Sequence, residues 1–523
     1  MTSASIAPVV RSEWIKFRSV RGWVVGMLVA GVLTLLVGVF AAGNVTIGCG
    51  PTLSGKACLP KVPIGPGGEA VTDSFYFVRQ PLAGNGSITV RVTALTTLIS
   101  TGSAAGPVGQ GPRNPLASMR KGLVPWAKAG IIIAASTRLG SAYAAMMVTG
   151  SHGVRMQYDY THDVAGLPGA VSAAAPHWLR LTRNGDVISG YDSADGRRWD
   201  LVGTATLPGL PQAVQAGLFA TSPVYHKVLP FFGGASVQAG ASQATAIIDD
   251  ITRRGQWPTA SWSGVNIGAS GNTPASGAGF FRQSGSAVTV SGSGDIAPVV
   301  PGAGSGYPTA TIEQPLVGIF IGLIAVVVVA AMFFTAEYRR GLIRTTFAAV
   351  PHRGRVLAAK ALVVAGAAFI VALGASVIAV PIGISRARNQ GQFVLPVGAL
   401  TEMRVLVGTA AMVAVAAVLA VAVGTILRRS AAAVITVIVG IVLPFLLSVT
   451  VLPAGVADWV LRLTPAAGFA IEQSIPHYSQ VSALSSPAGG QFPLTPWAGF
   501  AVLFLYAAVA LAAAVALLRR RDA

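Results

Sequence analysis

The sequence predicts a polytopic α-helical membrane protein of six spans, with a large all-β, jelly-roll-like sandwich inserted between spans 1 and 2. Three observations carry this prediction. Only 11% of the 523 residues are charged, against roughly 25% in soluble globular domains. Six apolar runs reach the roughly 20 residues that a helix needs to cross a bilayer. Between the first two runs, Gly, Ser, Thr and Pro become common and strand-like alternation appears.

The six apolar runs carry no charged residue in their interiors, and their Gly and Ala content favours close helix packing in lipid. We expect spans at Gly22–Gly43, Leu316–Thr335, Ala361–Ser385, Val405–Leu427, Ser430–Leu452 and Trp497–Leu518. The chain then divides into a cytoplasmic amphipathic segment (1–21), the first transmembrane helix (22–44), the extracellular β domain (45–312) and spans 2 to 6 (313–523).

Basic residues predict the orientation. With the N-terminus inside, the short cytoplasmic segments carry 15 Lys and Arg residues, whereas the short outer loops carry 4. The positive-inside rule then places both termini in the cytoplasm and residues 45–312 outside the plasma membrane. This distribution also accounts for the net charge of +19, so we expect no nucleic-acid partner.

The segment before the first span has the pattern of an interfacial helix. Val10, Trp14 and Phe17 share one helix face, and Arg11 and Arg18 lie on another. We expect this helix to lie on the lipid of the inner leaflet, although a plain basic tail is the alternative. The first apolar run exceeds the roughly 7–15 residues of a signal-peptide core, which favours a retained anchor.

Two cysteines, Cys49 and Cys58, follow the first span closely. On the outer side of the membrane they could close a small disulfide loop, because that compartment is oxidising. The alternative is a pair of unpaired thiols.

Strand signals run through the insert. Trp178–Gly203 predicts a three-strand meander, with a type I′ hairpin at Asn184-Gly185 and a second turn at Asp195-Gly196. We expect further strands at Ser87–Leu95, Gly130–Ala134, Tyr143–Thr149, Val154–Tyr160, Val214–Ala220 and Ala246–Ile251. Residues 255–311 are rich in Gly and Ser, which predicts a loose connector with one or two strands.

Three blocks, Ala127–Ser136, His177–Trp199 and Ala244–Ile251, resemble the concanavalin A-like lectin and glucanase superfamily over roughly residues 70–255. The resemblance implies carbohydrate binding, with Tyr191 and Trp199 stacking on a sugar; the alternative is that both are core aromatics. A glycosidase is disfavoured because the insert has a single Glu, whereas glycosidases mostly use paired carboxylates. Residues 159–163 (DYTHD) predict a hairpin loop rather than a metal site, so no metal is expected.

The loop between spans 2 and 3, Glu337–Lys360, is short and basic. We expect a helix over Glu337–Ala349 and a turn at Pro351. Its basic face would meet the anionic inner leaflet or an acidic protein partner. The alternative is that these charges only set the topology.

This loop, together with Arg11–Trp23 and Leu461–Ile471, is similar to actinobacterial permeases of the type-2 ABC exporters. The resemblance covers residues 8–44 and 313–521. It implies a permease dimer, with the loop docking on a separately encoded cytoplasmic ATPase. The residues then expected at or near that contact are Glu337, Tyr338, Arg339, Arg340, Gly341, Arg344 and Arg353. Leu342 departs from the Thr that many members carry after the glycine.

The chain contains no GxxxxGK[ST] motif, so it binds no cofactor of its own in this interpretation, and ATP acts through the partner. An ion-driven carrier is disfavoured because no charged residue lies deep in a predicted span. We therefore expect an exporter permease, not an enzyme, for an apolar or amphipathic substrate. The alternatives are a glycan-binding surface receptor anchored by the helices and a membrane-bound glycan enzyme.

Overall fold

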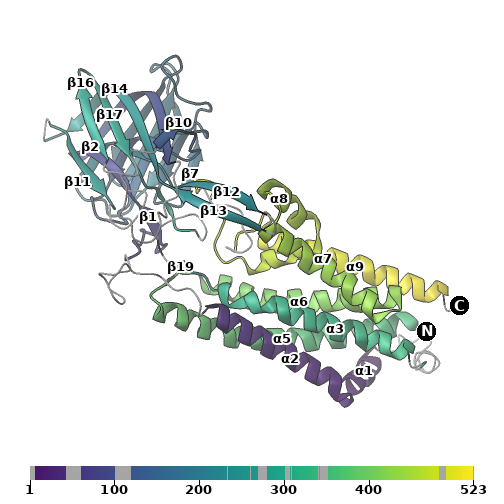
Figure 1. The fold of residues 1–523 in the computed structure, drawn as a ribbon. Coiled ribbons are helices and arrows are strands. Elements are labelled where there is room, and N and C mark those ends of the chain that lie inside the picture. Colours follow the sequence, from purple (N-terminus) through teal and green to yellow (C-terminus); the bar gives the residue numbers. More distant parts are fainter. Residues whose placement is uncertain are drawn as a thin grey trace, which may run out of the picture.

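The computed structural model describes residues 6–42, 61–100, 119–231, 234–258, 261–268, 279–300, 307, 309–339, 341, 352–481 and 490–521. A bundle of long helices carries a β domain at one end, and the N- and C-termini lie at the other end (Figure 1). We call these the domain end and the distal end. Within the described residues, six helices are long and apolar enough to cross a membrane, so the chain is a multi-pass membrane protein.

All six predicted spans are confirmed. The helices are α2 (Arg21–Ala42), α3 (Ile319–Arg339), α5 (Arg353–Asn389), α6 (Ala399–Leu427), α7 (Ser430–Thr450) and α9 (Pro496–Arg521). Small residues bring α2 and α3 together: a Cβ at Gly318 would collide with the carbonyl oxygen of Thr34, and one at Gly322 with the Thr34 side chain. Glycines four residues apart form the close-packing pattern of membrane helices.

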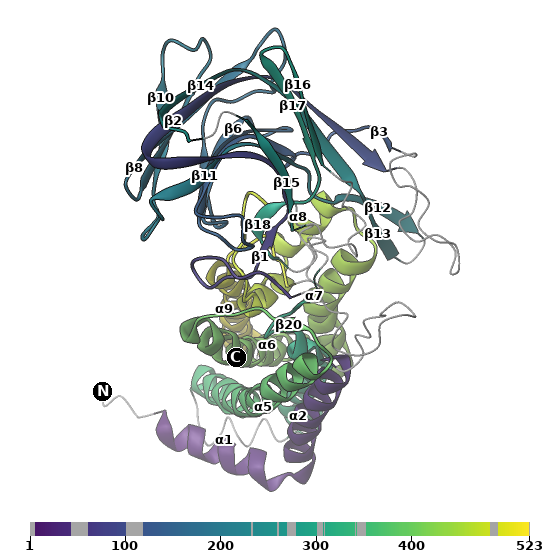
Figure 2. The same ribbon diagram turned by 90° about the vertical axis from the view of Figure 1, so that its left-hand side faces the viewer.

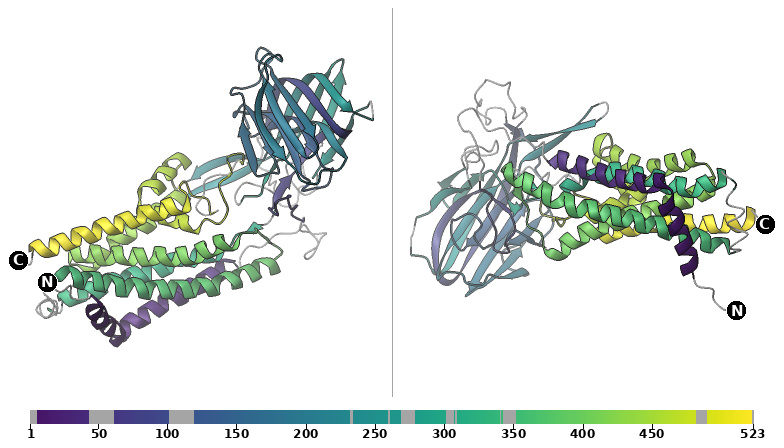
Figure 3. Two further views of the ribbon diagram at one scale, coloured as in Figure 1. Left: turned by 180° about the vertical axis from the view of Figure 1, so that it is seen from behind. Right: turned by 90° about the horizontal axis from the view of Figure 1, so that it is seen from below.

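The segment before α2 forms a separate helix, α1 (Ala7–Ser19), because the backbone turns extended at Val20. It runs across the distal end of the bundle rather than along it (Figure 3). Phe17 is buried and Val10 packs against the bundle core, whereas Trp14 is exposed, so the face expected to lie on lipid is turned in part to the bundle. The amphipathic helix is therefore confirmed, with part of its apolar face turned to the bundle and Trp14 turned outward.

The β domain consists of two antiparallel layers that share one 26-residue strand, β2 (Phe75–Ser100). Sheet A has the order β10 (Asp200–Thr206), β9 (Val187–Ser193), β8 (His177–Asn184), β2, β14 (Ser242–Gln256), β17 (Ala287–Gly292) and β16 (Phe280–Ser284). Sheet B has the order β15 (Ser263–Ile267), β2, β11 (Ala213–Thr221), β4 (Lys128–Ala134), β5 (Tyr143–Thr149), β6 (Val154–Tyr158) and β7 (His162–Ala165). The two layers are seen in Figure 2.

The central strands of sheet B, β4 and β5, are buried on both faces. Ile131 and Ile133 point into the core between the sheets, and Ile132 points into a second core on the other face. That second face is covered in part by the short pair β1 (Val71–Asp73) and β18 (Ile296–Pro298). A strand buried on both sides needs no apolar–polar alternation, which explains the continuous apolar run of β4.

Shorter strands complete the domain. Strand β3 (Met119–Lys121) pairs with β2. The hairpin of β12 (Tyr225–Phe231) and β13 (Gly234–Gly240) reaches toward the helices (Figure 1). Strand β19 (Thr309–Ala310) pairs with β20 (Phe393–Val394) of the bundle.

Two predictions about the insert are corrected. The β8–β9 hairpin turns at Gly185-Asp186, one residue later than predicted, because Asn184 is already paired with Val187. Of the two turn residues only Gly185 has positive φ, which is typical of a type II′ turn. Residues 255–311, predicted as a loose connector with one or two strands, instead contribute four strands to the domain, β15, β16, β17 and β18.

The β domain is seated on the bundle by its β6–β7 turn. The Gln480 side chain donates to the Tyr160 carbonyl at 3.1 Å, and the Ser479 hydroxyl donates to Asp163 at 3.3 Å. A small apolar cluster adds to this contact, with Ala70 and Val299 from the insert against Leu395 and Ile475 from the bundle. Two short helices also lie at the domain end, α8 (Ala454–Leu463) and the 3₁₀ helix η4 (Pro465–Glu472).

Candidate functional site

The candidate site is a buried ion cluster at the distal end of the bundle. Lys360 of α5 is fully buried, and its Nζ donates at 2.6 Å both to Glu13 Oε2 of α1 and to Glu337 Oε1 of α3. Lys16 of α1 completes the cluster, 2.7 Å from Glu13 Oε1 and 3.7 Å from Glu337 Oε1. Two lysines and two glutamates thus balance in charge while joining three helices.

The amino-acid sequence places these groups where they can meet. In α1, Glu13 and Phe17 are one helical turn apart and both face the bundle. Glu337 lies in the last turn of α3 and Lys360 in the third turn of α5, so the two residues flank the loop that joins these helices. The Lys360 ammonium also lies 4.7 Å from the centre of the Phe333 ring, a cation–π distance.

Because the cluster is buried, each of its charges needs a partner of opposite sign. Glu13 is 1% exposed and Lys360 0%, so neither charge is solvated by water. Charges taken out of water stay favourable only when they are paired and hydrogen-bonded, and removal of one partner costs about 3–5 kcal/mol. The cluster therefore fixes α1, the end of α3 and the start of α5 to one another.

The predicted loop residues divide into four groups. Glu337 and Tyr338 face the bundle. Tyr338 packs on Phe334 and lies 5.1 Å from the guanidinium of Arg428, the C-cap residue of α6. Arg353 begins α5 and donates to the Leu518 carbonyl of α9 at 3.0 Å. α3 ends at Arg339, and Gly341 has φ of +70°, so the continuous helix predicted over Glu337–Ala349 is interrupted there. Arg340 and Arg344 lie outside the described residues.

Sequence reasoning missed Glu13. The segment was interpreted through its basic residues, and Lys16 and Lys360 were counted only as topology signals. The one available signal was a lone acidic residue inside a basic, amphipathic segment, RSEWIKFR.

The aromatic pair proposed for glycan stacking lies on the half-exposed outer face of sheet A. Tyr191 of β9 is paired with Arg180 of β8, and the Arg180 guanidinium lies 3.8 Å from the centre of the Trp199 ring. Neither aromatic belongs to the buried cores. One face of Trp199 is therefore occupied by a side chain of the protein itself. Cys49 and Cys58 lie outside the described residues.

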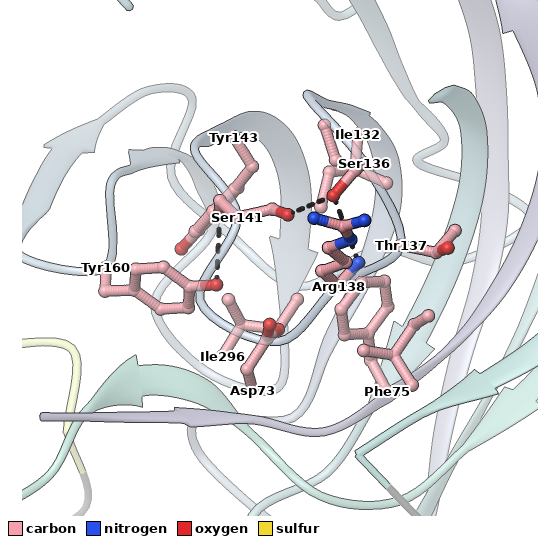
Figure 4. Close-up of a pocket in the computed structure, with 12 residues that line it drawn as sticks. Asp73, Phe75, Ile132, Ser136, Thr137, Arg138, Ser141, Tyr143, Tyr160 and Ile296 are labelled. Atoms are coloured by element: carbon pink, nitrogen blue, oxygen red, sulfur yellow. Dashed lines mark hydrogen bonds between the residues drawn. The ribbon is translucent and has the colours of Figure 1, made fainter. Parts of the chain in front are cut away.

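A polar pocket lies under sheet B (Figure 4). Asp73 accepts a hydrogen bond from the Gly140 amide at 2.9 Å, and Tyr160 donates to the Ser141 carbonyl at 3.2 Å. Burial raises the pKa of Asp73 to about 6. The cavity measures only about 10 Å³, enough for one water molecule at most. These groups are structural rather than a substrate site.

Comparisons with known proteins identify no family for this chain. No family model matches the sequence, and no curated protein matches it either. A functionally unknown protein from Saccharomyces cerevisiae has 15% identity and a TM-score of 0.23, covering 39% of this chain and 84% of that chain. Scytalido-glutamic peptidase, solved with a transition state analog inhibitor, has 8% identity and a TM-score of 0.26, covering 44% of this chain and 100% of that chain. Likenesses this distant support no inference about activity.

Proposed function

We propose that this chain is the permease subunit of an ATP-driven exporter. It would work as a dimer of permease subunits with a separate cytoplasmic ABC ATPase, and it would move an apolar or amphipathic substrate outward. The distal end of the bundle would face the cytoplasm and the β domain the exterior, in agreement with the basic residues of the short loops.

The observation that carries the proposal is the ion cluster beside the loop between α3 and α5. Glu337 and Lys360 hold the two helices that enter and leave this loop, and Glu13 ties both to α1. A partner that pushed on the loop would therefore move α1, α3 and α5 together. Rigid-body movement of packed helices is a common way to convert a local event into a change of access.

The resemblance of the loop to exporter permeases supplies the kind of partner. Arg339, Arg340 and Arg344 are the basic residues closest to the interruption at Gly341, and we propose that they contact the ATPase. The glycan-receptor alternative receives less support, because the ring face of Trp199 that Arg180 covers is not open to a sugar.

The test is affinity purification of the native protein in mild detergent, with mass spectrometry of stoichiometric partners. We expect a soluble protein with a Walker A motif, and we expect substitution of Arg339, Arg340 and Arg344 by Ala to release it. The matched control removes three exposed arginines elsewhere, Arg197, Arg198 and Arg388. Recovery of the chain alone, or equal ATPase retention in both triple variants, would contradict the proposal.

A further inference from the structure

A second buried polar cluster lies at the domain end, far from the ion cluster. Glu313 immediately precedes the 3₁₀ turn η3 (Gln314–Gly318) that leads into α3, and Glu472 is the last residue of η4. The two side chains are 9% and 8% exposed. Gly490 forms part of the wall, because a Cβ there would collide with Glu313 Oε1.

These carboxyl groups lack the partners that buried carboxylates need. Neither oxygen of Glu313 has a hydrogen-bond partner of good geometry within the described residues, and Oε1 of Glu472 has none either. The Thr409 and Ser474 hydroxyls are buried and likewise make no hydrogen bond of good geometry within the described residues, although Thr409 lies near Glu472 and Ser474 near Glu313. A buried carboxylate without a partner is costly, so such a group normally marks a proton or an ion.

The pKa shifts of the two glutamates agree with their burial. Burial raises the pKa of Glu313 to about 7. Burial, and then repulsion from Glu313, raises the pKa of Glu472 to about 8. The nearby Ser474 and Thr409 hydroxyls each lower one of these values without reversing the shift.

One positive group faces the pair. The Arg404 guanidinium of α6 lies near Glu313, and it donates to the carbonyls of Ile471 and Gln473 at 2.9 and 2.6 Å. Two glutamates and one arginine leave one net negative charge. The surrounding carboxyl and hydroxyl groups offer only oxygen ligands, which is the donor set of hard cations such as Na⁺ and Ca²⁺.

A groove lies beside the pair. A groove of about 750 Å³ opens at the domain end, and Arg404 and Ser474 both line it. The groove also carries Asp458, Arg462 and His477, so an entering cation would meet charges of both signs before it reached the pair.

We propose that Glu313, Glu472, Ser474 and Thr409 form a binding site for one hard cation, Na⁺ or Ca²⁺, reached through this groove. The cation joins the start of α3 to η4 by neutralising two carboxylates that otherwise repel. Protons compete with it for the same oxygens. The proposal does not depend on the exporter function.

The test uses the full chain, purified in detergent and stripped with a chelator. Thermal unfolding is followed at pH 8.5 with added CaCl₂ or NaCl, against choline chloride at matched ionic strength. A ligand that binds only the folded state raises the midpoint in a dose-dependent way. We expect such a rise with at least one of the two cations. The apparent affinity should weaken about tenfold as the pH falls from 8 to 7, where one proton is displaced per cation, and more steeply below pH 7, where both carboxyls hold a proton. Direct binding of ⁴⁵Ca²⁺ or ²²Na⁺ identifies the ion.

The variants are E313Q and E472Q, with E402Q as the control because Glu402 is an exposed carboxylate in the first turn of α6, close to Arg404. Gln keeps the shape and removes the charge, so both variants are expected to fold without added cation. We expect the cation-dependent rise and the radiolabel binding to be lost in both, and kept in E402Q. Equal cation responses in all three variants would overturn the proposal. So would a wild type that responds to pH but to neither cation, because the pair would then hold protons alone.

Discussion

Replacement of Lys360 by Met is the most direct test of the ion cluster. The change removes the ammonium that pairs with Glu13 and Glu337 at 2.6 Å each. Met keeps much of the apolar stem, so the loss of charge dominates. Two carboxylates then stay at the helix junction with only Lys16 to balance them. Removal of one partner from a buried ion pair costs about 3–5 kcal/mol.

The matched control is Lys16→Met. Lys16 belongs to the same cluster, but its side chain is 41% exposed, so water can replace its contacts. Exposed ion pairs contribute at most about 1 kcal/mol. We therefore expect the Lys360 variant to lose several times more unfolding free energy than the Lys16 variant.

The assay is reversible denaturation in mixed micelles, followed by tryptophan fluorescence and by gel filtration. A third variant, E13Q/E337Q/K360M, removes the charges together. It should recover much of the stability, because buried ion clusters replaced as a whole are often close to neutral. If K360M and K16M differ by less than about 0.5 kcal/mol, or if the triple variant is the least stable of the three, the buried-cluster argument is wrong.

Three further predictions follow from the fold. Burial raises the pKa of Asp73 to about 6, so the folded state holds this proton more tightly than the unfolded state. The stability that protonated Asp73 contributes is therefore lost as the pH rises from about 4 to 6. The D73N variant should be more stable than wild type by up to about 3 kcal/mol at pH 7.5 and by little at pH 4, measured as the difference in unfolding free energy. G318A should lower the yield of monodisperse protein severalfold because its Cβ meets the Thr34 carbonyl, whereas G366A, with open space around it, should not. In a background lacking Cys49 and Cys58, a cysteine replacing the exposed Ala194 should react with an impermeant maleimide on intact cells, and one replacing Ser12 only after permeabilisation; the reverse pattern would invert the proposed topology.

The spans and most strands were predictable because their signal is local. Apolar runs of about 20 residues and period-2 alternation are contained within single segments, so β5 was predicted with its observed bounds. The hairpin after Asn184 was misplaced by one residue because Asn-Gly favours type I′, whereas the pairing of Asn184 with Val187 puts the glycine first in a type II′ turn. The strands of residues 255–311 were hidden by their Gly and Ser neighbours.

The functional clusters were harder to predict because they are assembled from distant segments. Glu13 and Lys360 are 347 residues apart, and nothing local distinguishes Lys360 from a residue that merely sets orientation. Glu313 lies just before the second predicted span and Glu472 in the segment between the fifth and sixth, and charged residues are ordinary in both places. Only packing shows that these residues are buried, and burial is what makes their charges consequential.

The close approach of α2 and η3 also shows how a whole domain can be inserted between two packed helices. Gly38 near the end of α2 packs directly against the Pro315 carbonyl at the start of η3, so the chain leaves the bundle and returns to it at nearly the same point. A gene segment encoding a whole domain can enter or leave there without separating the helices. Each doubling of the length of a flexible connection costs only about 0.6 kcal/mol in closure entropy, and a folded insert with adjacent ends costs still less. The six-helix unit therefore leaves the size of the inserted β domain largely unconstrained.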